Sequence, residues 1–357
     1  MLLVVLGAGA SYDSAPSKHP DESTYSNLMG RPPLANQLFA DRPDFGNVMN
    51  KYPKVLDIAP RLRHLQGELS IETVLQGYQS ETLEYPERFQ QLASVRYYLQ
   101  EIISSCTNQW VHACQNFLNH QPLLDDIKRW HRKGDKVCFV TFNYDKLLEY
   151  SLYRAGFPIT SLSEYITQDF ILIKLHGSVD WARYVDTGIH PRFEGDALVR
   201  ELIMHSGELK ISQRYMMGGD VAPHVKDNSV LFPALAIPIE DKIDFECPSD
   251  HVTALETFLP KVTKILIIGW RAAEKPFLNM LRKGCASSNP EIMIVNGRTD
   301  EGLRAADNIR RLGFSANYHV VNGGFTDFIR QNSGREFLRQ TDSQLPVCGA
   351  KPASRAG

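Results

Sequence analysis

The chain has 357 residues, of which 43% are hydrophobic and 22% charged. This composition is typical of a globular protein with room for one large domain or two smaller ones, and it excludes disorder as the main theme. The 39 basic and 41 acidic residues give a net charge of −2, so no global field favours nucleic acid or anionic lipid. We therefore expect no membrane association and no strong intrinsic nucleic-acid binding.

The six cysteines are spread along the chain without any C-x-x-C pair. This spacing argues against a zinc module or a disulfide framework, and it favours a reducing, cytoplasmic location. The segment Met1–Ala10 superficially resembles a signal peptide, but it lacks a basic region ahead of its short apolar stretch. We interpret it as a buried strand. No other stretch approaches the roughly 18 uninterrupted apolar residues of a membrane span.

Short apolar runs recur along the chain and end at polar residues or glycine, a pattern typical of strands buried on both faces of a parallel sheet. These predicted strands cover residues 2–6, 136–141, 170–174, 264–268, 291–295 and 317–321. Helical patterns lie between several of them, for example over 276–284 and 299–312. The alternation predicts an α/β fold with a Rossmann-like, doubly wound parallel sheet.

Two long insertions interrupt this alternation. Residues 33–133 show helical periodicity, for example over Arg88–Cys106, and we expect them to form a helical insertion. Residues 181–258 combine aromatic, proline and glycine residues with short apolar runs, and we expect a smaller irregular lobe over the sheet edge. The expected organisation is one domain over 1–340 that contains both insertions, followed by a flexible C-terminal tail over 341–357.

The first candidate site is the glycine-rich turn Gly7–Ser11, directly after the first strand. Such a turn lets the backbone approach a diphosphate closely, with helix N–H groups facing the negative charge. Tyr12 occupies the third glycine position of the G-x-G-x-x-G fingerprint, and the insertion removes the ribose-binding acid expected about 20 residues later. An ordinary dehydrogenase is therefore disfavoured. A tight turn without a ligand is the alternative interpretation.

The second candidate site is Thr141-Phe142-Asn143-Tyr144-Asp145, at the end of the second predicted strand. Ligands of open α/β sheets bind outside the carboxyl ends of strands, where an amide and a carboxylate can bond a ribose, a water or a carboxamide. The alternative is a helix N-cap, in which Asn143 or Asp145 satisfies free N–H groups of a helix over Leu147–Tyr153.

The third candidate site is Lys174-Leu175-His176-Gly177-Ser178, again at a strand end. A histidine there can take a proton near neutral pH, and Gly177 would let a ligand come close to the backbone. A structural histidine is the alternative. Because the topology of an α/β sheet brings all three strand ends to one edge, we expect the three sites to form one crevice.

Together and in this order, the motifs resemble those of the Sir2-like domain proteins, distant relatives of sirtuins found in bacterial anti-phage defence. The resemblance rests on the three segments above and on Arg31-Pro32-Pro33-Leu34. It covers the core strands through Ile268-Gly269-Trp270 and Val295-Asn296. The family resemblance implies a Sir2-like fold that uses NAD as a substrate.

The resemblance also implies roles for individual residues. Asn143 would sit by the nicotinamide ribose and position a water, Asp145 would lie near the carboxamide, and His176 would contact the ribose hydroxyls as general base. The remaining implied cofactor-binding residues are Gly7, Ala8, Gly9 and Ser11 along the diphosphate, Gly269 and Asn296 beside the adenosine half, and Thr141 and Gly177 within the motifs.

Two departures from sirtuins bear on the reaction. Sirtuins have glutamine where Phe142 stands, and sirtuin deacetylases carry a four-cysteine zinc module that no cysteine spacing here could build. We therefore expect no zinc and favour an NAD⁺ glycohydrolase over a protein deacetylase. Breaking the nicotinamide bond creates an oxocarbenium-like ribose, which needs an aligned water, a base and a dry pocket.

The leading hypothesis is an NAD-consuming effector of anti-phage defence that cleaves NAD to nicotinamide and ADP-ribose. By resemblance, it would be a homo-oligomer that is gated by a partner such as a HerA-like ATPase or another defence protein. The alternative is a non-catalytic module that senses NAD or ADP-ribose, or a scaffold for a nucleic-acid-processing partner. The presence of both Asn143 and His176 favours the enzyme.

Overall fold

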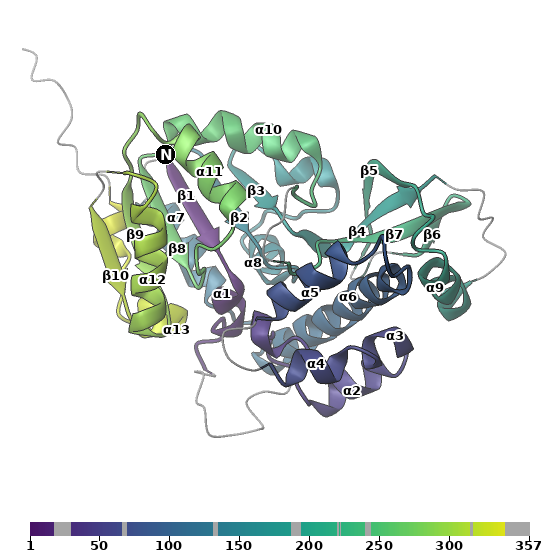
Figure 1. Ribbon diagram of the computed structural model, residues 1–357. Coiled ribbons are helices and arrows are strands. Elements are labelled where there is room, and N and C mark those ends of the chain that lie inside the picture. Colours follow the sequence, from purple (N-terminus) through teal and green to yellow (C-terminus); the bar gives the residue numbers. More distant parts are fainter. Residues whose placement is uncertain are drawn as a thin grey trace, which may run out of the picture.

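The computed structural model describes residues 1–17, 30–65, 70–130, 135–186, 194–219, 221, 223–239, 244–314 and 317–339, and the tail predicted over 341–357 lies outside them. A six-stranded parallel sheet forms the centre of the molecule, with the strand order β10-β9-β8-β1-β2-β3 (Figure 1). Its strands are β1 (Leu2–Leu6), β2 (Val137–Thr141), β3 (Phe170–Lys174), β8 (Lys264–Ile268), β9 (Glu291–Val295) and β10 (Tyr318–Val321).

The order of the strands identifies the sheet as Rossmann-like. Numbered within the sheet alone, the strands follow the order 3-2-1-4-5-6 of dinucleotide-binding folds. All six predicted strands are confirmed, four of them with the predicted bounds. The sequence reveals these strands because every residue of β1, β2 and β3 is buried. They are therefore continuous apolar runs, apart from the last residues of β2 and β3.

Helices cover both faces of this sheet. In Figure 1, α7 (His120–Trp130) and α8 (Leu147–Arg154) lie behind the sheet, and α10 (Ser249–Phe258), α11 (Lys275–Gly284) and α12 (Thr299–Arg310) lie in front of it. The predicted helices over 276–284 and 299–312 correspond to α11 and α12. The shorter helices around the sheet are α1 (Ala8–Tyr12), α13 (Gly324–Arg330), α14 (Arg335–Leu338), η3 (Leu162–Tyr165) and η4 (Leu259–Lys261).

The first insertion is helical, as predicted, and its described residues contain no strand. Its long helix α6 (Glu87–Ala113) is the centre of the group, and α2, α3 and α5 pack against it. The other elements are η2 (Ala35–Gln37), α2 (Pro43–Met49), α3 (Pro53–Leu56), α4 (Ala59–Arg63) and α5 (Ile71–Ser80).

The second insertion is more regular than the sequence suggests. It forms a four-stranded antiparallel sheet in the order β5-β4-β7-β6, together with α9 (Gly195–Met204). The strands are β4 (Gly177–Val185), β5 (Ile211–Met217), β6 (Val225–Lys226) and β7 (Ser229–Leu235). The expected irregular lobe is thus a small sheet that begins at Gly177, and α10 packs on β3 of the central sheet. Register shifts in both pairings of β4 interrupt the alternation that would reveal these strands.

Both insertions meet at the carboxyl edge of the central sheet. In Figure 1, β1 runs from the N-terminus towards α5 and α6. Val179 of β4 and Ile237 after β7 are part of the hydrophobic core of the helical insertion, and Tyr144 from the loop after β2 packs against it. The carboxyl edge is therefore covered by structure that a minimal doubly wound sheet does not need. Within the part of the chain that the structure describes, no helix is both long and apolar enough to cross a bilayer.

Candidate functional site

The glycine-rich turn after β1 packs against the loop that follows β8. A Cβ on Gly7 would lie 2.5 Å from the carbonyl oxygen of Gly269, and a Cβ on Gly9 would lie 2.8 Å from the Gly269 Cα. Gly269 itself has φ +61°, and its Cβ would lie 2.3 Å from the amide nitrogen of Ala10. These three glycines are therefore required for the contact between two neighbouring loops of the sheet.

The same contact uses N–H groups that the sequence interpretation assigned to a diphosphate. Gly7 N donates to Ile268 O at 3.0 Å, and Gly9 N donates to Gly269 O at 3.0 Å. Neighbouring backbone carbonyls already accept these two N–H groups, so the two glycines could line a diphosphate only by letting the backbone come close, not by donating to it. The Ala8 N–H donates to none of the acceptors among the described residues, so it is the free backbone donor at the start of this turn.

Asn143 connects the loop after β2 to the glycine turn. Its Nδ2 donates to Gly7 O at 2.9 Å and to Ser11 Oγ at 2.8 Å. Because Gly7 O can only accept, the amide nitrogen must face it, which fixes the orientation of the side chain. Its Oδ1 accepts no hydrogen bond from any described residue and remains an acceptor. The Thr141 side chain supports this loop by accepting from Asn143 N at 3.1 Å.

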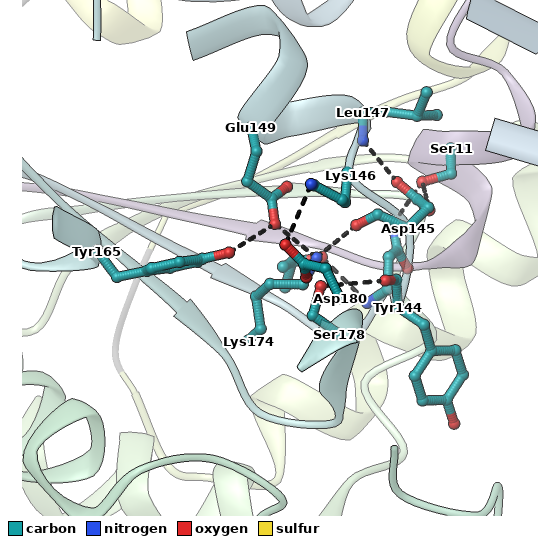
Figure 2. Close-up of polar contacts among 12 residues, drawn as sticks. Ser11, Tyr144, Asp145, Lys146, Leu147, Glu149, Tyr165, Lys174, Ser178 and Asp180 are labelled. Atoms are coloured by element: carbon teal, nitrogen blue, oxygen red, sulfur yellow. Dashed lines mark hydrogen bonds and ion pairs between the residues drawn. The ribbon is translucent and has the colours of Figure 1, made fainter. Parts of the chain in front are cut away.

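Asp145 continues the same chain of hydrogen bonds. Ser11 Oγ donates to Asp145 Oδ2 at 2.6 Å, and the N–H of Leu147, the first residue of α8, donates to Asp145 Oδ1 at 3.0 Å (Figure 2). Both carboxylate oxygens thus have partners, and one of them caps a helix, as the alternative interpretation of this motif expected. The arrangement makes Asp145 a fixed anchor between α1, the β2 loop and α8.

His176 lies beside this network and against an aromatic wall. Its ring is 5.0 Å from the Phe142 ring, edge to face, and 6.1 Å from the Tyr144 ring. Phe142 in turn stacks on Trp270 at 5.2 Å and packs on Phe277. The predicted convergence of the three strand-end motifs is therefore confirmed for their geometry. The phenyl ring of Phe142 gives the site an apolar wall.

Gly177 has a structural explanation. Its φ is +80°, and a Cβ would lie 1.9 Å from Ala234 O of β7. The positive φ and the close β7 backbone require glycine here without any ligand. The sequence interpretation, in which Gly177 lets a ligand approach the backbone, is therefore not needed to explain this residue.

Asn296 follows β9, on the other side of β8 from the network. It is buried, and its Nδ2 has no hydrogen-bond partner among the described residues. Its backbone is fixed, because Asn296 N donates to Val321 O at 3.2 Å and Gly324 N donates to Asn296 O at 3.1 Å. A buried amide donor without a partner is costly. It is the kind of group that a polar ligand at this edge would satisfy.

Arg31, from the fourth motif of the resemblance, lies next to the glycine turn. Its Nη1 donates to Tyr12 O at 2.7 Å, and its guanidinium lies 4.6 Å from the Trp110 ring of α6. Burial holds its pKa below the ordinary value. Arg31 therefore links the helical insertion to the end of α1.

Sequence reasoning missed a buried charge cluster directly behind Asp145. Lys174, at the end of β3, donates to the backbone carbonyl of Asp145 and to Glu149 Oε1 at 2.7 Å (Figure 2). Lys146 Nζ lies 3.1 Å from Asp180 Oδ2. Burial raises the pKa of the Asp180 carboxyl, and the lysines at 146 and 174 oppose that shift. The signal in the sequence that could have revealed this cluster is Lys174, a lysine at the end of an otherwise apolar strand.

The described residues include no group of three or more histidine, cysteine, aspartate or glutamate side chains placed to hold a metal ion. Among the described residues, the Ala8 N–H, the Asn143 Oδ1 and the Asn296 Nδ2 are donors and acceptors at this edge without a protein partner. The His176 imidazole lies beside the Asn143 loop. The arrangement can orient a small polar molecule against a fixed acceptor next to an imidazole and an aromatic wall.

No protein-family model matches this chain, and no curated protein matches it. Among solved structures, the chain is similar to a complex of Sir2 with a peptide and NAD⁺, with 16% identity, coverage of 95% of this chain and 94% of that chain, and a TM-score of 0.38. It is also similar to Sir2 in complex with an inhibitor, 2′-O-acetyl-ADP-ribose and a deacetylated peptide, with 15% identity, coverage of 95% and 94%, and a TM-score of 0.39. A structure on the basis of sirtuin substrate affinity has 15% identity, coverage of 93% and 92%, and a TM-score of 0.41. All three of these solved structures are described as Sir2 or sirtuin structures.

Proposed function

We propose that this protein is an NAD⁺ glycohydrolase, which cleaves the bond between nicotinamide and ribose and releases nicotinamide and ADP-ribose. The observation that carries the proposal is the set of hydrogen bonds made by the Asn143 side chain. Both of its donor positions are spent on Gly7 O and Ser11 Oγ, and its Oδ1 is left as an acceptor. Such an oxygen can accept from a water and hold it in one orientation, which a hydrolysis needs.

His176 is the general base of this proposal. Its imidazole lies beside the Asn143 loop, and imidazole is the side chain whose ordinary pKa suits proton transfer near neutral pH. The Phe142 ring excludes water from one side of the imidazole, which strengthens charge stabilisation within the site. As the ribose develops positive charge, the fixed water and the base are the two groups the reaction requires.

The dinucleotide fits the remaining groups of the edge. The Ala8 N–H is a backbone donor for an anionic oxygen, and the unpartnered Asn296 Nδ2 would bond the adenosine half on the far side of β8. Together with the strand order, these groups support NAD as the substrate. The residues that carry the proposed chemistry are thus spread over the ends of β1, β2, β3 and β9.

The test is nicotinamide release from NAD by the purified protein, followed by chromatography, for the wild type and for Asn143→Ala and His176→Ala. Each substitution is expected to lower turnover by at least about 100-fold while the melting transition stays cooperative. His319→Ala is the matched control, because its imidazole is half-exposed and bonded to Glu291 at the opposite edge of the sheet. Wild-type turnover in both site variants would refute the assignment. Binding of ADP-ribose without any nicotinamide release, both alone and with the neighbouring gene product, would identify a sensor instead.

We further propose that the enzyme is a homo-oligomer whose activity stays low until a defence partner, such as a HerA-like ATPase, or a phage-derived signal acts. An unrestrained NAD hydrolase would poison its own host, and an effector can relieve restraint only by binding the active conformation better. The two insertions provide surface for such assembly. Light scattering combined with NAD turnover, with and without the neighbouring gene product, tests this control. A fully active monomer would exclude it.

A further inference from the structure

The charge cluster behind Asp145 has no role in the chemistry proposed above. Lys174 and Asp180 are fully buried, and Glu149 is nearly so. The Tyr165 hydroxyl donates to Glu149 Oε1 at 3.2 Å, while Glu149 Oε2 has no described partner. Lys146 lies at the border of the cluster, where its Nζ also donates to Gly219 O at 2.7 Å.

Stability does not explain this cluster. Removing a charge from water costs several kcal/mol per ion, and a buried pair often stabilises a fold less than well-packed apolar residues of similar volume. The rest of β3 is the apolar run Phe170–Ile173, so a further apolar residue at position 174 would suit the strand. Core packing therefore does not explain the ammonium group at position 174.

The contacts of Lys174 indicate that reason. Its Nζ reaches the backbone carbonyl of Asp145, and Glu149 on α8 holds the ammonium from the other side (Figure 2). The Asp145 carboxylate is fixed by Ser11 and by the N–H of Leu147. The loop after β2 is thus tied down at both the backbone and the side chain of one residue, two positions after Asn143.

We propose that Lys174 is a positioning residue, which fixes the loop Thr141–Asp145 so that the Asn143 amide keeps the orientation needed for NAD cleavage. This inference rests on the proposed function, since the loop matters because it carries Asn143. A displacement of reacting groups by about 1 Å costs about 100-fold in rate. An ammonium that bonds a backbone carbonyl restrains the loop in a way that an apolar side chain cannot.

The test compares Lys174→Met, the double variant Lys174→Met/Glu149→Leu, and Lys264→Met. Lys264 is the matched control, because its ammonium also bonds backbone carbonyls, those of Phe337 and Arg339, but at the amino edge of the same sheet. The double variant removes both charges of the pair, so that no unpaired charge stays buried and the fold is retained.

Two measurements are made on each variant: hydrogen exchange at the amides of residues 141–147, and kcat and KM for NAD. In Lys174→Met and in the double variant, we expect exchange in this segment to rise at least about tenfold and kcat to fall at least about tenfold, with a smaller change in KM. In the double variant, kcat stays low although thermal stability recovers. A purely structural ion pair predicts that stability and kcat recover together, and that outcome would overturn the proposal.

The exchange measurement separates this inference from the proposed function. If the wild type releases no nicotinamide, alone or with the neighbouring gene product, the proposed function fails, and loop protection that depends on Lys174 still supports the positioning role. If the loop keeps its wild-type protection in both Lys174 variants, the positioning role is refuted whatever the turnover. Lys264→Met is expected to match the wild type in both measurements.

Discussion

The polar groups at the two edges of the central sheet differ in their exposure to water. At the amino edge, the Met1 ammonium bonds Lys261 O and Thr263 Oγ1 in exposed positions, and the half-exposed His319 bonds Glu291. At the carboxyl edge, the polar side chains of Ser11, Asn143, Asp145, Lys174 and Asn296 are all buried. The same six parallel strands form both edges, so the backbone does not explain this difference.

This difference indicates where the sheet carries function. The Met1 ammonium and the His319 ring at the amino edge stay close to water, so keeping them there costs little. Polar groups at the carboxyl edge are held away from water, where each depends on bonds to its neighbours. Such an arrangement is expected where a ligand, and not only the fold, selects the residues. The comparison yields four tests, in order of expected effect.

The largest effect is expected for Gly269→Ala, at the loop contact of the carboxyl edge. The positive φ of Gly269 and the 2.3 Å approach of its Cβ to Ala10 N should together destabilise the fold by about 3 kcal/mol or more. Gly297→Ala is the control, since a Cβ there meets no atom within 4 Å. Chemical denaturation measures both. Equal stability of the two variants would show that the loops do not need this close contact.

The second effect concerns His120, which is buried at the start of α7. Burial lowers its pKa to about 3, so the unfolded chain binds a proton that the folded chain rejects. The contribution of this residue to stability is therefore complete above the ordinary pKa of about 6.5 and is lost as the pH falls towards about 3, at about 1.4 kcal/mol per pH unit. His120→Gln should remove this slope in denaturation series between pH 7 and 5. His319→Gln at the amino edge is the comparison, and an unchanged slope in His120→Gln would contradict the burial argument.

The third effect is a trade between stability and binding at Asn296. Replacing a buried amide whose Nδ2 has no partner by an apolar side chain, in Asn296→Val, should stabilise the fold by about 1 kcal/mol. The same change should weaken ADP-ribose binding about tenfold, because one hydrogen bond to the ligand is lost. Denaturation and calorimetric titration measure the two quantities. If Asn296→Val is less stable than the wild type and binds ADP-ribose equally tightly, Asn296 contributes to folding and not to ligand binding.

The smallest effect is expected at the amino edge, for Lys264→Met. Its ammonium bonds the carbonyls of Phe337 and Arg339 near the protein surface, so its loss should destabilise the fold by about 1 kcal/mol or less. Nicotinamide release should stay at the wild-type level. A large loss of turnover in this variant would remove the distinction between the two edges.

The central sheet could be predicted from the sequence. Strands such as Leu2–Leu6 and Phe170–Lys174 are buried on both faces, so a continuous apolar run marks each of them in one dimension. The convergence of Gly7, Asn143 and His176 also followed from sequence, because parallel strands deliver their carboxyl ends to one edge. The small antiparallel sheet did not follow, because polar residues and register shifts hide its strands.

The contacts of individual residues in the site could not be predicted from the sequence. The need for glycine at positions 7, 9 and 269 comes from loops that are more than 250 residues apart in the chain. Whether Asp145 caps a helix, and whether Lys174 reaches its carbonyl, depends on how β2, β3 and α8 pack against each other. Motifs record which residue types are present, whereas a hydrogen bond depends on distances between segments that the fold alone brings together.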